Sequence, residues 1–169
     1  MISGVGRTYE ELEVGAVYRS RFGRTVLDAD NVWFTLLTMN TNPIHFDTAY
    51  AASTEWKQPL VDSTFTLALV TGLSVADVSE QAVNLGWREI RLPAPVFAGD
   101  TIRAETEILE KRESRSNPGV GIVAMRSRGI NQRREVVIEF RRTIMIYRRD
   151  APEAAVDFPG TDAGWSVDA

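Results

Sequence analysis

The sequence has no cysteine and only one histidine among its 169 residues. Without cysteine, disulfides, thiolate nucleophiles, zinc fingers and iron–sulfur clusters are excluded, and a cytoplasmic location becomes the expectation. A single imidazole also excludes every site that needs two histidine ligands. We therefore expect neither a metal ion nor a redox cofactor.

Long hydrophobic runs and an excess of positive charge are also missing. No apolar stretch approaches the roughly 20 residues of a membrane span, and the N-terminus carries no signal-peptide pattern. Segment 151–169 holds four acidic residues and no basic one, so it accounts for the net charge of −4 and leaves 19 acidic and 19 basic groups elsewhere. Nucleic-acid binders are normally basic on at least one face. The expected partners therefore include neither nucleic acid nor a membrane.

What the sequence does contain is typical of one globular domain. Hydrophobic residues make up 44% and charged residues 25%, a balance that excludes disorder of the whole chain. A chain of this length buries roughly 70% of its unfolded surface, so a core forms without covalent cross-links. We place the domain at residues 1–150 and expect the acidic segment 151–169 to be a loose tail.

The first half of the chain predicts one interrupted strand at residues 17–26, followed by short helices. Asp28 or Asp30 can cap the first helix. The expected apolar face of this helix consists of Val32, Trp33, Phe34, Leu36, Leu37 and Met39. Residues 40–43 end it, because the proline there lacks an N–H donor and restricts the residue before it. A second short helix is expected over residues 48–52.

Residues 63–78 predict the central element of the fold. Apolar residues lie on nearly every face of this helix, so we expect the rest of the protein to bury it all round. Four strands are then predicted, at residues 84–92, 101–109, 120–130 and 135–147, and polar and apolar residues alternate along 101–109 as in a half-buried strand. Together the elements predict an α+β fold in which a long antiparallel sheet wraps around one apolar helix.

The segment Leu37–Asp47 carries a motif that points to a known family. Its Asn-Pro-Ile-His at 42–45 resembles the Gly-Asp-x-Asn-Pro-aliphatic-His signature of MaoC-like dehydratases, also called R-specific enoyl-CoA hydratases. Small residues follow at Ala51 and Ala52, and Pro95–Ile102 is similar to the family's Pro-Val and Gly-Asp-Thr segment. The resemblance covers residues from about 15 to 148. It implies the hotdog fold, whose element order matches the order predicted above.

The resemblance implies a hydratase in which His45 is catalytic. Adding water to a 2-enoyl thioester needs a base for the water that attacks C3, an acid for C2, and donors for the charge on the thioester oxygen. Histidine suits the first two tasks because it exchanges protons near neutral pH. The family has a glycine and then an aspartate before this turn, and Met39 and Asn40 occupy those positions here.

Asn40 leaves three interpretations open, because an amide cannot accept a proton. His45 acts alone as acid and base while Asn40 orients the water; another carboxylate, such as Asp47 or Asp62, replaces the missing aspartate; or the site is inactive. We favour the first, because asparagine and aspartate are nearly isosteric and the rest of the motif is intact. A simple helix cap is the alternative role for Asn40.

Substrate contacts are expected at the start of the central helix, where free N–H groups and the helix dipole favour negative charge. By resemblance, the donors to the thioester oxygen are backbone amides of Asp62, Ser63 and Thr64, and we assign Ser63 and Thr64 to substrate binding. Arg91 is a candidate for contact with CoA phosphates. A solvated strand face explains Arg91 equally well.

The resemblance also suggests a substrate. Residues 38–45 and 22–26 look like the branch of the family that acts on itaconyl-CoA or mesaconyl-CoA. We therefore expect a short enoyl-CoA substrate, with a C5 dicarboxylic thioester as the leading candidate.

We expect a homodimer or higher homo-oligomer, because the edge of a lone sheet is usually paired. Two other functions stay open. One is a non-catalytic hotdog subunit or acyl-thioester-binding protein that completes a partner's site, and the other is a thioesterase.

Overall fold

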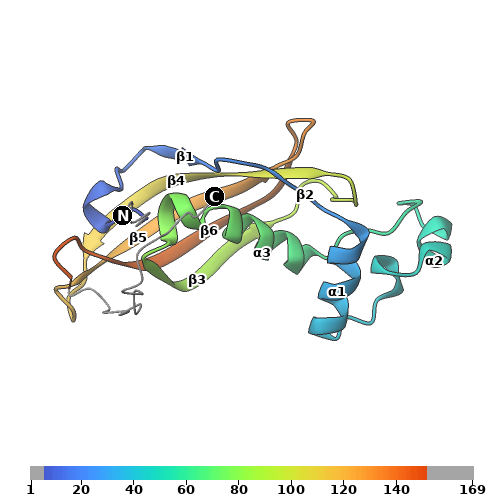
Figure 1. The fold of residues 1–169 in the computed structure, drawn as a ribbon, viewed down its shortest axis with the longest axis horizontal. Coiled ribbons are helices and arrows are strands. Elements are labelled where there is room, and N and C mark those ends of the chain that lie inside the picture. Colours follow the sequence, from blue (N-terminus) through green and yellow to red (C-terminus); the bar gives the residue numbers. More distant parts are fainter. Residues whose placement is uncertain (1–5, 152–169) are drawn as a thin grey trace, which may run out of the picture.

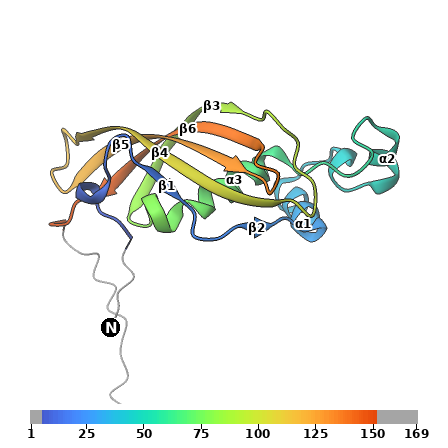
Figure 2. The same cartoon turned by 90° about the horizontal axis from the view of Figure 1, so that it is seen from above.

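A computed structural model describes residues 6–151, which form a long sheet with one helix laid across it (Figure 1). The short N-terminal elements α1, η2 and α2 lie beyond one end of the sheet (Figures 1 and 2). In chain order the elements are η1 (Tyr9–Glu11), β1 (Val17–Arg19), β2 (Arg24–Thr25), α1 (Asp28–Thr38), η2 (Pro43–His45), α2 (Thr48–Ser53), α3 (Ser63–Leu73), η3 (Val75–Ser79), β3 (Ala82–Arg91), β4 (Thr101–Glu113), β5 (Val120–Ile130) and β6 (Val136–Tyr147).

The sheet is antiparallel throughout, with the order β1-β4-β5-β6-β3 and β2 paired to β4. The α+β prediction is therefore confirmed, as are the four predicted strands of the second half, although β4 runs further, to Glu113. β4, β5 and β6 follow one another in both sequence and space. β3 precedes these three strands in the sequence, pairs with the side of β6 opposite to β5, and forms one edge of the sheet.

The two faces of the sheet differ in chemistry because side chains alternate along each strand. On the face toward α3, buried apolar residues such as Ile102, Phe140 and Ile144 form the core. The opposite face carries ion pairs, for example Glu105 with Arg128 at 2.7 Å. The core therefore lies between α3 and one face of the sheet.

Gly129 lets α3 approach β5 closely. A Cβ atom at this position would lie 2.5 Å from Cγ2 of Val70 on the helix and 3.0 Å from Cγ2 of Ile138 on β6. Atoms at such distances overlap, so any larger residue would push the helix away from the sheet and open the core. Glycine at 129 thus sets the spacing of the two layers.

The prediction that the central helix is buried all round is wrong for this chain. Within α3 only Thr66 and Val70 are buried, while Ala68 and Gly72 are exposed. The physical reason is that the described part of the chain supplies a sheet on one side of the helix and nothing on the other (Figure 1). The α-helix also ends at Leu73, five residues earlier than predicted, and continues as the π-helical turn η3.

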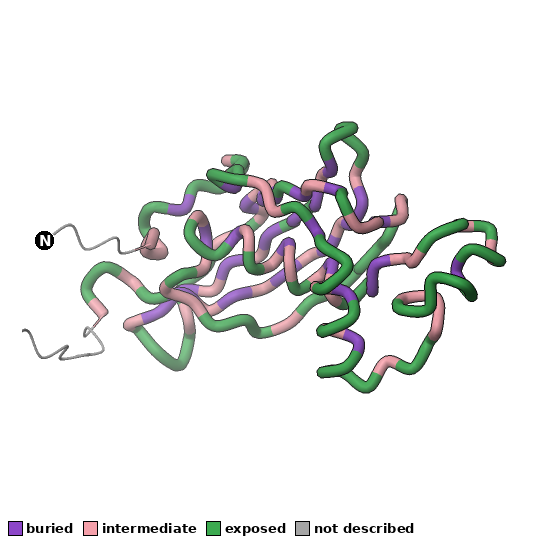
Figure 3. The backbone as a smooth tube through the Cα atoms, turned by 45° about the vertical axis from the view of Figure 1, so that its right-hand side comes forward, coloured by how far each residue is buried: buried purple, intermediate pink, exposed green. Residues whose placement is uncertain are grey.

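The predicted apolar face of the first helix is wrong as well. The buried residues of α1 are Asn31 and Thr35, whereas Trp33 and Leu37 are 65% and 77% exposed. α1 lies beyond the end of the sheet (Figure 2), and most of its length is exposed or half-buried (Figure 3), so the described part of the sheet does not cover its apolar side. Phe34, which packs edge-on against Phe65 of α3 at 5.5 Å, is the aromatic contact that joins this helix to the core.

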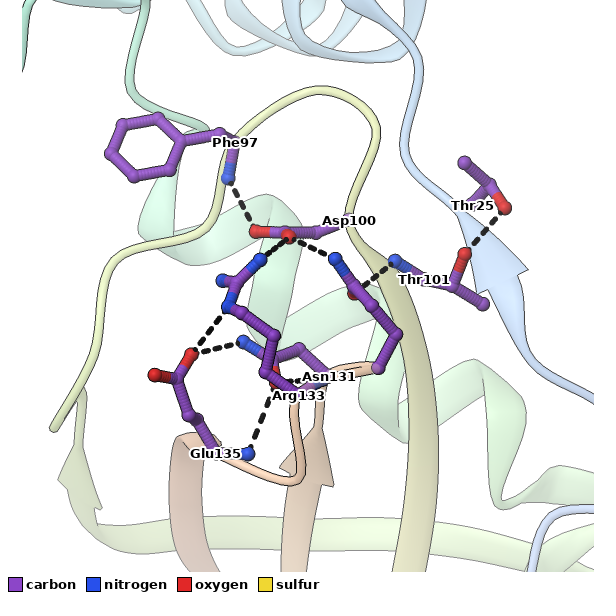
Figure 4. A network of polar contacts seen from close by, with 8 residues as sticks. Thr25, Phe97, Asp100, Thr101, Asn131, Arg133 and Glu135 are labelled. Carbon is purple, nitrogen blue, oxygen red and sulfur yellow. Dashed lines mark hydrogen bonds and ion pairs between the residues drawn. The ribbon is translucent and has the colours of Figure 1, made fainter.

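Asp100 organises the turn that leads into β4 (Figure 4). Its buried carboxylate accepts the N–H of Phe97 at 3.1 Å and side-chain donors of Gln132 and Arg133 at 2.8 Å each. Burial by itself would raise the pKa of Asp100, but the hydrogen bonds from Arg133 and Gln132 lower it. The turn is therefore tied to the loop between β5 and β6.

The expected tail, residues 151–169, lies outside the described residues apart from Ala151. The division into a domain at 1–150 and a tail stays a prediction. Within residues 6–151, no helix combines the length and the apolar character that crossing a membrane requires.

Candidate active site

The motif begins where α1 ends in a left-handed residue. Met39 has φ 57° and ψ 29°, a conformation that glycine adopts with least strain, and it stands where the family signature has glycine. The N–H of Asn40 returns to the carbonyl of Thr35 at 3.0 Å. This reversal directs the Asn40 side chain toward the start of α3.

His45 is positioned by a turn whose sequence predicts its shape. Asn42 caps η2 by accepting the N–H of Ile44 at 3.2 Å, and Pro43 stands at the first helical positions, where a missing N–H costs nothing. Nδ1 of His45 lies 2.7 Å from the carbonyl oxygen of Leu60. A carbonyl oxygen only accepts, so Nδ1 donates this hydrogen bond, and Nε2 has no hydrogen-bond partner among the described residues.

Asn31 links the elements of the site, and the sequence did not identify it. Its Nδ2 donates to the carbonyl oxygens of His45 at 2.6 Å and Leu60 at 3.0 Å, and its Oδ1 accepts the N–H of Asp62 at 2.9 Å. It is 3% exposed, so the loss of these bonds would leave buried groups unsatisfied. The one sequence feature that could have indicated this role of Asn31 is its polar side chain, four residues before Thr35, in a helix with many apolar residues.

Asp62 caps α3 and also holds Asn40. One carboxylate oxygen accepts the N–H groups of Thr64 and Phe65 at 2.7 and 3.2 Å, and the other accepts Nδ2 of Asn40 at 2.5 Å. Burial alone would raise the pKa of Asp62, but the hydrogen bonds from the Thr64 hydroxyl, the Asn40 amide and the two N–H groups lower it. The lowered pKa makes Asp62 a weak base, so its role in this structure is to cap α3 and to hold Asn40.

The second carboxylate considered as a replacement is also a helix cap. Asp47 accepts the N–H of Tyr50 at 2.9 Å and begins α2. Asn40 uses one N–H of its amide for Asp62, and its Oδ1 accepts the N–H of Asn42 at 3.1 Å. Among the described residues, its second N–H and the second lone pair of Oδ1 are therefore available to a water molecule. These contacts favour the interpretation in which His45 moves the proton and Asn40 orients the water.

Only one of the three backbone amides expected to bind the thioester oxygen is without an acceptor in the described structure. The N–H of Asp62 is donated to Asn31, and that of Thr64 to the Asp62 carboxylate. The N–H of Ser63, at the first position of α3, has no acceptor among residues 6–151. Ser63 and Thr64 are exposed, so a ligand can reach this helix end.

Arg91 is not brought to the other candidate residues by any contact in the described structure. It ends β3, lies opposite Glu139 of β6 and is exposed.

An apolar hollow of about 400 Å³ adjoins Asn40. It is lined by Val32, Thr35, Leu36, Met39, Asn40, Thr41 and Phe46. Within residues 6–151 the site thus combines an imidazole nitrogen without a hydrogen-bond partner, an amide, a helix N-terminus and an apolar surface.

Comparison with protein families finds a match to the MaoC like domain over residues 10–128, a range that contains the whole site. The chain belongs to the MaoC-like domain family. The expected family is therefore confirmed, and the strand and helix order found here is the order that the family resemblance implied.

Relatives of this MaoC-like chain include hydratases. It is 33% identical to a mesaconyl-CoA hydratase of Cereibacter sphaeroides over 162 residues, which cover 94% of this chain and 47% of that protein. It is 33% identical to an (R)-specific enoyl-CoA hydratase of Aeromonas caviae over 109 residues, covering 63% and 78% of the two chains. The chain thus spans about half the length of the first curated relatives it matches.

Among solved structures, a Mycobacterium tuberculosis protein described as having a double hotdog fold matches this MaoC-like chain with a TM-score of 0.79. The identity is 21%, and the match covers 97% of this chain and 54% of the other. At this identity the likeness concerns the fold alone. It agrees with the predicted hotdog architecture.

Proposed function

We propose that this chain hydrates a short 2-enoyl-CoA thioester, reversibly, with His45 as acid and base. The observation that carries the proposal is the hydrogen bond of Nδ1 to the Leu60 carbonyl, which fixes the ring and leaves Nε2 free to take a proton. The relatives named as hydratases support the same reaction class. No metal or redox cofactor takes part in it.

The proposed reaction uses one water molecule for both ends of the double bond. His45 Nε2 removes a proton from water as the oxygen attacks C3, and the electron pair of the double bond moves toward the thioester oxygen. The N–H of Ser63 stabilises this developing negative charge. The imidazolium then returns its proton to C2, so the net change is the addition of one water.

Asn40 takes the place of the family aspartate in this proposal by orienting the water. Its amide both donates and accepts, and its bond to Asp62 fixes which end of the amide faces the helix. Orientation without proton transfer contributes through positioning alone. Thr64 is proposed to contact the substrate beside Ser63, and Arg91 to contact CoA phosphates.

For the acyl group we propose a C5 dicarboxylic thioester, mesaconyl-CoA or itaconyl-CoA, on the strength of the 33% identity to a mesaconyl-CoA hydratase. The cytoplasmic location expected from the sequence stays a prediction. Rates for mesaconyl-, itaconyl- and crotonyl-CoA measured side by side test the choice of substrate. A preference for crotonyl-CoA would contradict it.

We further propose that two copies of the chain assemble through β3. β3 is an edge strand with exposed apolar side chains at Val83, Leu85, Trp87 and Ile90, and the exposed Leu92 follows it. A relative with a double hotdog fold is about twice as long as this chain, so a second copy would supply what the second half supplies there. Such a pairing also removes an aggregation-prone edge.

The decisive experiment is the loss of enoyl absorbance with the purified chain, compared with His45→Ala. We expect turnover to fall at least ~100-fold, the usual effect of a lost acid–base group, while the melting temperature stays close to wild type. Asp47→Asn, which changes an exposed carboxylate near the turn, serves as the matched control and should retain activity.

Two outcomes distinguish the alternatives. No hydration by the wild-type chain alone, with activity restored by a partner protein, would identify a non-catalytic subunit. Release of free CoA thiol in step with the loss of absorbance would identify a thioesterase, because hydration releases no thiol. Near-normal turnover of His45→Ala would overturn the mechanism.

A further inference from the structure

Arg142 is a buried arginine in the core, far along the sheet from the motif residues. It lies in the middle of β6, faces α3 and is 1% exposed. Its neighbours across the sheet are Met125 on β5 and Trp87 on β3. Because α3 lies across this face (Figure 1), the guanidinium is enclosed between sheet and helix.

The guanidinium has too few acceptors around it. Nη2 donates to Oγ of Ser74 at 3.2 Å and lies 3.3 Å from Sδ of Met125. Nε and Nη1 are buried and have no hydrogen-bond partner among the described residues. None of the ion pairs within residues 6–151 includes Arg142. A buried charge without a partner is among the most destabilising features a core can have.

The helix above supplies one acceptor, the hydroxyl of Ser74, and one further donor, the hydroxyl of Thr71. Ser74 donates its hydroxyl to the carbonyl of Thr71 at 2.7 Å, so it can only accept from Arg142. The hydroxyl of Thr71, one turn earlier on α3, is also buried and without a partner among the described residues. Three buried groups able to donate, two on Arg142 and one on Thr71, therefore lack acceptors.

The guanidinium of Arg142 is charged at neutral pH, and the neighbouring acidic residues form ion pairs with other arginines. Burial lowers the pKa of Arg142 to about 10, which still leaves the guanidinium protonated at pH 7. Asp77 of η3, the acid on the covering element, lies 3.7 Å from Nη1 of Arg7 and pairs with it. Glu89 of the adjacent edge strand pairs with Arg141, whose side chain faces the other side of the sheet.

We propose that Arg142 and Thr71 form an enclosed site for one small monovalent anion, such as chloride. An anion accepts from several donors and donates to none, which matches the excess of donors, whereas water would bring donors of its own. The surrounding Met125, Phe140 and Ile144 are apolar and buried, which favours a single-atom ion over a larger one. The anion would join the end of α3 to β6, apart from the site at the start of that helix.

The test begins with wild-type protein unfolded in chloride-free urea and refolded in sodium gluconate, because an enclosed ion exchanges slowly by dialysis. Thermal unfolding is then followed as gluconate is replaced by chloride, and separately by bromide, at constant ionic strength. We expect the melting temperature to rise and saturate, by roughly 5 °C when chloride is about one hundred times its dissociation constant. Crystals grown in bromide should show an anomalous peak within hydrogen-bonding distance of Nε or Nη1 of Arg142.

Two variants and a control separate a site from a general salt effect. Arg142→Met keeps the length of the apolar stem and should remove the chloride dependence. Thr71→Val should weaken it, and this variant serves if Arg142→Met does not fold. Arg126→Met, on the exposed face of the neighbouring strand, should keep the full dependence.

The proposal is overturned if wild-type protein melts at the same temperature in gluconate and chloride. It is also overturned if the chloride dependence survives in Arg142→Met and Thr71→Val. A bromide-grown crystal in which only water density lies beside Arg142 would have the same consequence.

Discussion

Asn40 and Asp62 form the contact on which the candidate site depends most at the scale of single residues. The amide of Asn40 lies 2.5 Å from a carboxylate that also caps α3, so position 40 faces a fixed negative charge. The family signature has aspartate at position 40. In this chain an aspartate there would place two carboxylates in contact.

Asn40→Asp is therefore expected to destabilise the protein in a pH-dependent way. Two carboxylates in contact cannot both ionise, so the pKa of one of them is raised in the folded state. A raised folded-state pKa contributes stability at low pH that is lost as pH rises. The deficit relative to wild type should be small near pH 4 and grow to roughly 1–3 kcal/mol at pH 7. Thermal unfolding between pH 4 and pH 8 measures it.

The double variant Asn40→Asp with Asp62→Asn is the matched control for this prediction. It restores one amide and one carboxylate with exchanged places, and asparagine also caps helices well. We expect it to recover most of the stability at pH 7. A deficit in Asn40→Asp that does not change with pH would contradict the contact.

At the scale of elements, the last turn of α1 ends in a strained backbone conformation. Met39 is the left-handed residue of the cap, and its side chain is 80% exposed and contributes little packing. A left-handed residue with a Cβ atom costs roughly 1–2 kcal/mol. Glycine avoids this strain but loses more conformational entropy on folding.

Met39→Gly is expected to stabilise the protein by about 0.5–1 kcal/mol, the difference between those two effects. Urea unfolding at pH 7 measures the change. Met39→Ala keeps the Cβ atom and the strain, so it should give no gain. Equal stability of the glycine and alanine variants would show that the cap is not strained.

At the scale of the whole molecule, the exposed apolar residues of β3 lead to a prediction about assembly. We expect sedimentation at micromolar concentration to give at least twice the chain mass of 18.8 kDa. Replacing Leu85 and Ile90 by lysine should yield a monomer, because charges on an edge strand oppose pairing. Val17→Lys, an exposed apolar residue on β1 at the opposite edge, should leave the assembly intact. A monomeric wild type would contradict the proposed dimer.

A second prediction at this scale concerns residues 151–169. Four acids, no base and no hydrophobic period predict little contribution to stability. Deleting the segment should move the melting temperature by less than about 3 °C. A larger drop would mean that Phe158 or Trp165 packs on the domain, and alanine at either position in the full chain should then reproduce it.

The sequence by itself predicted the strands of the second half and the turn that carries His45. Alternation along 101–109 predicted that strand because a half-buried strand has a period of two whatever lies next to it. The turn at 42–45 was equally predictable, since Asn42 and Pro43 act on their own backbone.

Only the tertiary structure decided which faces are buried and which polar groups meet. The apolar pattern of α1 and α3 indicated helices but not their coverage, because burial depends on where other elements lie. Asn40 and Asp62 are separated by 22 residues, and Arg142 and Ser74 by 68. Contacts over such separations are set by how the layers pack, and no local pattern in the sequence encodes them.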